Sequence, residues 1–154
     1  MKVNLFVAVA AGGLLLAGTA AAQEKKIKRS DLPPAVEKTV AAQSAGATIK
    51  GFSTEKENGQ TLYEAEMTVN GHSKDISMTS DGSIVEIEEQ VAMDSLSADV
   101  RAGLQSKAGK GKILKVESLT KKGKLVAYEA KVDTNGKKSE VQVGPDGKPL
   151  DHEE

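Results

Sequence analysis

Cysteine and tryptophan are absent from this sequence, and two tyrosines and two phenylalanines are its only aromatic residues. Without cysteine, no disulfide can stabilise the fold, and a thiolate zinc site is excluded. Histidine is almost absent too, since only His72 and His152 occur. Two histidines are too few for the three or four nitrogen or sulfur ligands of a usual zinc site. The core must therefore be built from aliphatic residues and methionine.

Neither sign of charge is in excess. The chain has 21 basic and 22 acidic side chains, which give a formal net charge of −1. A protein that binds nucleic acid needs a basic surface, so this balance argues against such a partner.

The first 22 residues have the features of a secretory signal peptide. Lys2 supplies a positive charge, an uncharged apolar run follows from Leu5 to Gly18, and small residues stand at Ala20 and Ala22. The run of roughly 14 residues is shorter than the ~20 needed to span a bilayer, and no later stretch could span one. We expect cleavage after Ala22 and a periplasmic or secreted protein. The basic residues 23–29 are expected to form a flexible N-terminus.

The remainder of the chain repeats itself. Tyr63-Glu64-Ala65 recurs as Tyr128-Glu129-Ala130, and Asn70-Gly71 recurs as Asn135-Gly136. Apolar residues recur at nearly constant spacing as well. This self-similarity predicts a tandem duplication, with one unit at 30–90 and the other at 91–154. In the first unit the repeated apolar positions are Leu32, Val36, Val40, Ile49 and Phe52, and in the second they are Leu96, Val100, Leu104, Ile113 and Val116.

Each unit is expected to be a helix followed by four strands. Leu32, Val36 and Val40 recur every four residues, which is typical of one apolar helix stripe. Later segments alternate apolar and polar residues and are separated by Asn-Gly and Asp-Gly pairs, which favour tight hairpin turns. The predicted fold class is α+β, with two tandem repeats of one helix and a four-stranded antiparallel meander. The helix should pack on one sheet face, and the sheets of the two units could be joined.

This pattern resembles the PepSY-like domain, including its β-lactamase-inhibitor-like branch. The resemblance is carried by residues 63–67 with 81–85, and by residues 128–132 with 146–150. It covers nearly the whole chain after residue 22 and implies an exported, non-catalytic module. Some members of that family restrain peptidases, and the similar β-lactamase inhibitor protein grips its enzyme with the open sheet face. This chain departs from that inhibitor because it lacks cysteine and has no aromatic residue at the expected open-face positions.

The sheet face that the helices leave uncovered, called the open face below, is the candidate partner-binding site. The alternation places seven acidic residues on it: Glu64, Glu66, Asp75, Glu86, Glu88, Glu129 and Glu140. Such a surface could receive a basic protein or peptide, or it could bind cations. An ordinary solvated face explains the same residues.

No residue pattern indicates catalysis. Neither histidine recurs in the other unit, so neither is expected to act as a base, and no cofactor or metal site is predicted. We therefore expect a non-catalytic binding module that acts through the open face, possible targets being a peptidase or another envelope protein. The alternative is an envelope protein that binds or senses a small ligand or cation. A hydrolase is disfavoured by the residue inventory.

Overall fold

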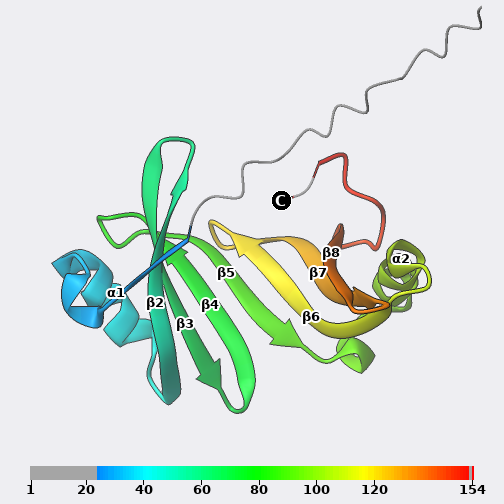
Figure 1. Ribbon diagram of the computed structural model, residues 1–154, viewed down its shortest axis with the longest axis horizontal. Helices are drawn as coiled ribbons and strands as arrows, with labels where there is room; N and C mark the ends of the chain where they lie inside the picture. Colours follow the sequence, from blue (N-terminus) through cyan, green and yellow to red (C-terminus); the bar gives the residue numbers. More distant parts are fainter. Residues whose placement is uncertain (1–23, 153) are drawn as a thin grey trace, which may run out of the picture.

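One twisted antiparallel sheet of eight strands dominates the computed structural model (Figure 1). The structure describes residues 24–152 and 154, so the predicted signal peptide lies outside the described residues. Strand order in the sheet follows the sequence, from β1 at one edge to β8 at the other. Of the helices within the described residues, none is long and apolar enough to cross a membrane.

The elements follow one another with short connections. The helices are η1 (Arg29–Asp31), α1 (Pro34–Gln43), η2 (Met93–Ser95) and α2 (Ala98–Ala108), where η denotes a 3-10 turn. The strands are β1 (Lys25–Ile27), β2 (Ala47–Glu57), β3 (Gln60–Val69), β4 (His72–Met78), β5 (Ile84–Val91), β6 (Lys112–Lys121), β7 (Lys124–Thr134) and β8 (Lys137–Val143).

The expected pair of helix-plus-four-strand units is wrong as a description of this fold. The strands form a single sheet, because β5 pairs with β6 from Glu86↔Lys121 to Val91↔Val116. The second half also contributes three strands instead of four. After Val143 the chain turns, with the Gly144 amide donating to the carbonyl of Lys148, and no strand follows among the described residues. Pro149, which has no amide hydrogen, stands where a fourth strand was expected.

The eighth strand comes from the other end of the chain. Lys25–Ile27, expected to belong to a flexible N-terminus, forms β1 and pairs with Thr54, Ser53 and Phe52 of β2. Within the sheet, the β2–β3 register shifts between Ile49 and Gly51.

Two separate apolar clusters lie on the same side of the sheet, one under each helix. Figure 1 shows α1 outside one end of the sheet and α2 outside the other. Tyr63 and Tyr128 are partly buried against the first and second cluster. The buried residues under α1 are Leu32, Val36, Val40, Phe52, Ala65, Met67, Ile76 and Met78, and those under α2 are Leu96, Val100, Leu104, Val116, Ala130, Val132 and Val143.

The two Asp-Gly turns press against the helices. A Cβ on Gly82 would lie 2.5 Å from the carbonyl oxygen of Ala35 in α1, and a Cβ on Gly147 would clash with the carbonyl of Asp99 in α2. Both glycines also have positive φ, which other residues adopt only with strain. These turns therefore hold each helix against its half of the sheet and leave the other face free of helices.

The start of α2 carries a side-chain cap that α1 lacks. Ser97 precedes α2, and its hydroxyl accepts a hydrogen bond from the Val100 amide at 3.2 Å. We expect Ser97→Ala to lower the free energy of unfolding by about 1 kcal/mol, as measured by urea denaturation. Ser106→Ala is the control, because Ser106 is exposed in the same helix and alanine favours helices. Equal effects of the two changes would contradict the capping role.

Candidate functional site: the open face

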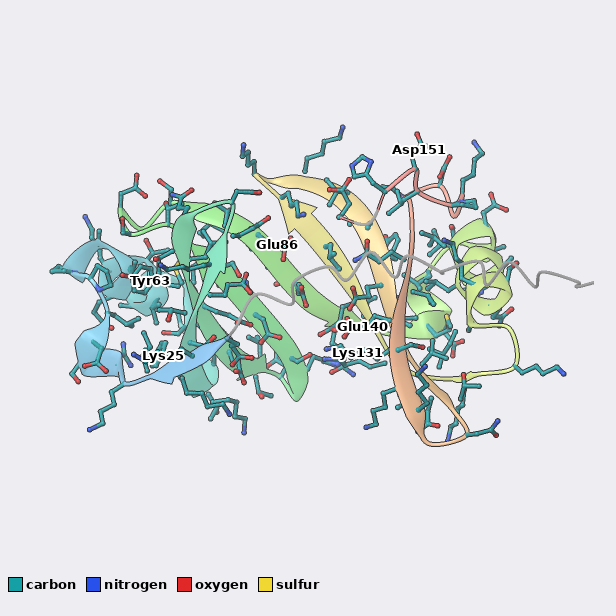
Figure 2. The ribbon with its side chains drawn as sticks, turned by 45° about the horizontal axis from the view of Figure 1, so that its top comes forward. Lys25, Tyr63, Glu86, Lys131, Glu140 and Asp151 are labelled. Carbon is teal, nitrogen blue, oxygen red and sulfur yellow. The ribbon has the colours of Figure 1, made fainter. Side chains whose placement is uncertain are left out.

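All seven predicted residues lie on the sheet face turned away from both helices. Strand register connects them: Glu66 faces Asp75, Asp75 faces Glu88, and Glu64 and Glu86 both face Ser77. Across the other half, Glu129 faces Gln142 and Glu140 faces Lys131. Residues of opposite parity, such as Ala65 and Ile76, belong to the cluster under α1. Figure 2 shows Glu86, Lys131 and Glu140 among the side chains of this face.

The open face is drier than an ordinary solvated sheet surface. Leu62 and Leu119 are buried on it, with exposed fractions of 5% and 2%, and Ala127 is fully buried. Leu119 stands directly opposite Glu88 and opposite Ala127 in the register. Apolar side chains therefore remove water from the neighbouring carboxylates, and that removal disfavours their charged form.

Four of the seven predicted open-face carboxyls have raised pKa values. Burial raises the pKa of Glu88 to about 8, and the nearby charges of Glu86, Glu129 and Glu117 add to the shift. Burial is also the main cause of the raised pKa values of Glu64, Asp75 and Glu129.

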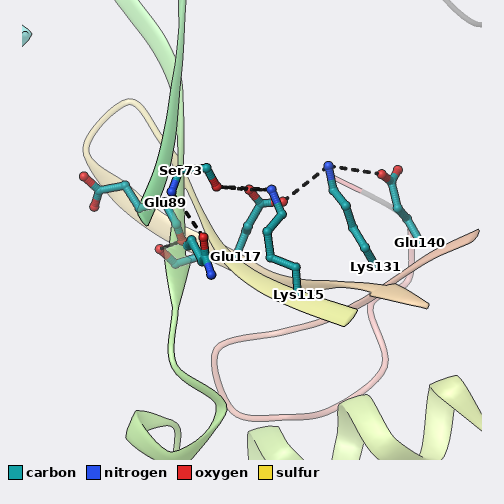
Figure 3. Close-up of polar contacts among 8 residues, drawn as sticks. Ser73, Glu89, Lys115, Glu117, Lys131 and Glu140 are labelled. Carbon is teal, nitrogen blue, oxygen red and sulfur yellow. Dashed lines mark hydrogen bonds and ion pairs between the residues drawn. The ribbon is translucent and has the colours of Figure 1, made fainter. Parts of the chain in front are cut away.

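A buried glutamate that sequence reasoning missed lies at the centre of the second half. Glu117 of β6 is 1% exposed and faces Glu129. Its Oε1 contacts Lys115 Nζ at 2.6 Å and accepts from the Ser73 hydroxyl at 3.1 Å, and Lys131 Nζ lies 3.5 Å from its Oε2 (Figure 3). In the repeat, Glu117 occupies the position of Ser53. The alternation of β6 could have predicted its face, but its partners Ser73 and Lys131 come from other strands.

Lysines compensate only part of the open face. Lys121 Nζ lies 3.3 Å from Glu86 Oε2, and Lys131 bridges to Glu140 Oε1 at 3.6 Å as well as to Glu117. Burial tends to lower the pKa of Lys131, but the carboxylates around it, Glu117 first, raise it overall. The side chains of Glu117 and Glu140 are thus held in a chain of ion pairs across β6, β7 and β8.

Five of the seven predicted carboxylates form no ion pair with another residue of the part that the structure describes: Glu64, Glu66, Asp75, Glu88 and Glu129. Glu64 instead accepts a hydrogen bond from the Ser53 hydroxyl at 2.9 Å. Glu66, Asp75 and Glu88 face one another on three adjacent strands. Like charges directly opposite in a sheet are destabilising, so this row costs stability that a counter-charge would restore.

The end of the chain contacts the same face at the β6–β8 side. The Gln142 side chain donates to Glu129 Oε2 at 2.9 Å and accepts from the backbone amide of Glu154 at 2.8 Å. Glu154 Oε2 also lies 3.7 Å from Lys121 Nζ. A hollow of about 360 Å³ opens beside these groups, and its walls include Leu62, Ser77 and Glu86.

Both histidines lie on the surface of the described part of the chain. His72 begins β4 and His152 follows the last turn, and both are exposed. His152 lies 3.8 Å from Glu154 Oε1.

Comparisons with known proteins identify the fold. No family model matches the chain, and no curated protein matches it. Three solved structures share the fold: a proposed periplasmic protein of Bacteroides eggerthii (TM-score 0.62, 17% identity), a DUF2874 family protein of Bacteroides ovatus (0.58, 19%) and a BLIP-like protein of Bacteroides fragilis (0.54, 18%). They cover 77%, 77% and 75% of this chain, and 86%, 84% and 81% of their own. Identities this low show a common fold alone.

Proposed function

We propose that this chain is an exported, non-catalytic binding protein of the cell envelope that receives a basic segment of a protein partner on its open face. The observation that carries the proposal is the row of Glu66, Asp75 and Glu88, which face one another without an ion-pair partner in the described part of the chain. Lysine or arginine side chains of a partner would supply the missing counter-charge. The buried apolar side chains around Leu119 would strengthen each such contact, because a low local dielectric strengthens electrostatic attraction.

The location and the kind of partner have separate support. The predicted signal peptide and the fold shared with a proposed periplasmic protein support a periplasmic or secreted location. The fold shared with a BLIP-like protein supports recognition of a protein. The PepSY-like resemblance of residues 30–90 and 91–154 favours a peptidase as the restrained partner. We also propose that these two segments arose by tandem duplication of one sequence.

The test compares two variants with the same loss of charge. Purified protein is immobilised and exposed to envelope extract, and the captured proteins are quantified by mass spectrometry. Glu64→Gln combined with Glu66→Gln should lose the specific partner, whereas Glu89→Gln combined with Asp94→Asn should retain it. Glu89 and Asp94 are exposed acidic residues away from the open face.

Salt and kinetics complete this experiment. Binding of the captured protein, once purified, should weaken as ionic strength rises, mainly through slower association, because the Debye length falls from ~10 Å at 0.1 M to ~3 Å at 1 M. Retention of every captured protein by the open-face variant, with salt dependence unchanged, would refute the proposal.

A further inference from the structure

A cluster of three carboxylates occurs at one point of the open face where β4, β5 and β6 run side by side. Asp75, Glu88 and Glu117 each direct one carboxylate oxygen to this point, and these oxygens all lie within 4.8 Å of one another. Asp75 and Glu88 are directly opposed in the register, and Glu117 belongs to the next strand.

Glu117 supplies a second observation that is independent of the clustering. Its Oε2 is the one buried side-chain nitrogen or oxygen atom among the described residues that has no hydrogen-bond partner. The side chain is 1% exposed, and its other oxygen already contacts Lys115 and Ser73. Lys131 Nζ stands 3.5 Å from Oε2 and is shared with Glu140. A buried carboxylate oxygen without a hydrogen bond is costly, so Oε2 is open to a further positive ligand.

We propose that Asp75, Glu88 and Glu117 form a binding site for one divalent cation of the oxygen-preferring class, and specifically for Ca²⁺. Carboxylate oxygens are the ligands of hard cations, and the site offers no nitrogen or sulfur for zinc or copper. Two oxygens on opposite sides of a Ca²⁺ ion, each ~2.4 Å away, are about 4.8 Å apart. The three oxygens therefore already fit within one Ca²⁺ coordination sphere.

The lysines near the cluster do not prevent this binding. Lys131 can keep its contact with Glu140, which lies 3.6 Å away, when a cation takes its place at Glu117 Oε2. Lys115 contacts the other oxygen of Glu117. The three carboxylates supply three to five oxygens, and water supplies the remainder of the six to eight that Ca²⁺ takes.

The test is calorimetric titration of CaCl₂ into the purified mature protein after chelation and dialysis. We expect one Ca²⁺ per chain, with an affinity in the range of extracellular calcium modules, on the order of 0.1–1 mM. Glu88→Gln should weaken binding by roughly tenfold or more, since it removes a direct ligand. Glu89→Gln is the matched control on the same strand, and it should leave the affinity unchanged because Glu89 points to the other face.

Several outcomes would overturn the proposal. Absence of Ca²⁺ binding at millimolar concentration would do so, as would equal losses in Glu88→Gln and Glu89→Gln. Mg²⁺ binding as tightly as Ca²⁺ would overturn the assignment to Ca²⁺. Amide chemical-shift changes on titration should be concentrated at Asp75, Glu88 and Glu117, and changes confined to other surfaces would reject this site. The capture experiment in chelator tests partner binding separately.

Discussion

Glu88→Gln is expected to make the protein more stable than wild type at about pH 8, while the two proteins should have equal stability at about pH 4. The pKa of Glu88 is about 8 in the folded protein, against a value of 4.5 for the unperturbed side chain. Below 4.5 the carboxyl is protonated in both states, so it makes no difference to stability. Between these two values the folded protein holds a proton that the unfolded chain has lost, and stability falls as pH rises.

The size of this effect follows from the linkage between protons and folding. One carboxyl that titrates in this way changes the free energy of unfolding by at most ~1.4 kcal/mol per pH unit. Glu88 is half-buried, and solvent screening reduces the total. We expect Glu88→Gln to gain on the order of 2 kcal/mol at about pH 8. The pKa values of Glu64, Asp75 and Glu129 are also raised. The free energy of unfolding of the variant should therefore still fall as pH rises, but less steeply than that of the wild type.

Urea denaturation in chelator at several pH values measures this difference. Glu89→Gln is again the control, because Glu89 is exposed on the other face and pairs with Lys74 at 3.0 Å. Such an exposed pair is worth ~1 kcal/mol or less. If Glu88→Gln gained no more than Glu89→Gln between about pH 5 and pH 8, Glu88 would not be the strained carboxyl that its surroundings imply.

The sequence could predict which face each strand residue occupies, because alternation depends only on local geometry. The parity of Glu64, Glu66 and Asp75 follows from their neighbours Ala65, Met67 and Ile76, which are buried. The same local reasoning found the turn at Asn70-Gly71, where both residues have positive φ. These predictions needed no knowledge of distant parts of the chain.

The environment of each side chain could not be predicted in the same way. Glu88 is desolvated partly because Leu119 stands opposite it, and that contact depends on the β5–β6 pairing. The sequence left open whether the two halves share a sheet. For the same reason Glu117 was missed, since its partners Ser73 and Lys131 come from β4 and β7. The end of the sheet at Val143 was also missed, because a turn after it competes with a fourth strand.

Lys115→Met is expected to destabilise the protein by on the order of 2–3 kcal/mol at neutral pH, because it leaves a buried carboxylate without its nearest counter-charge. Lys115 Nζ lies 2.6 Å from Glu117 Oε1 and also donates to Ser73 Oγ at 3.1 Å. Glu117 is 1% exposed, so water cannot replace the lost lysine. Lys131, at 3.5 Å from the other oxygen, compensates only in part. Lys74→Met is the control, since its partner Glu89 is half exposed and should tolerate the loss at ~1 kcal/mol or less.

A second substitution separates the buried charge from the loss of lysine packing. Glu117→Gln added to Lys115→Met removes the charge that needs compensation, so the double variant should recover most of the lost free energy of unfolding. The measurement is urea denaturation of the single and double variants in chelator, with the interaction free energy taken from the full cycle. A double variant as unstable as Lys115→Met alone would show that the lysine stabilises the sheet through its alkyl chain and not through Glu117. The charge network of the open face would then be a consequence of the fold and not one of its supports.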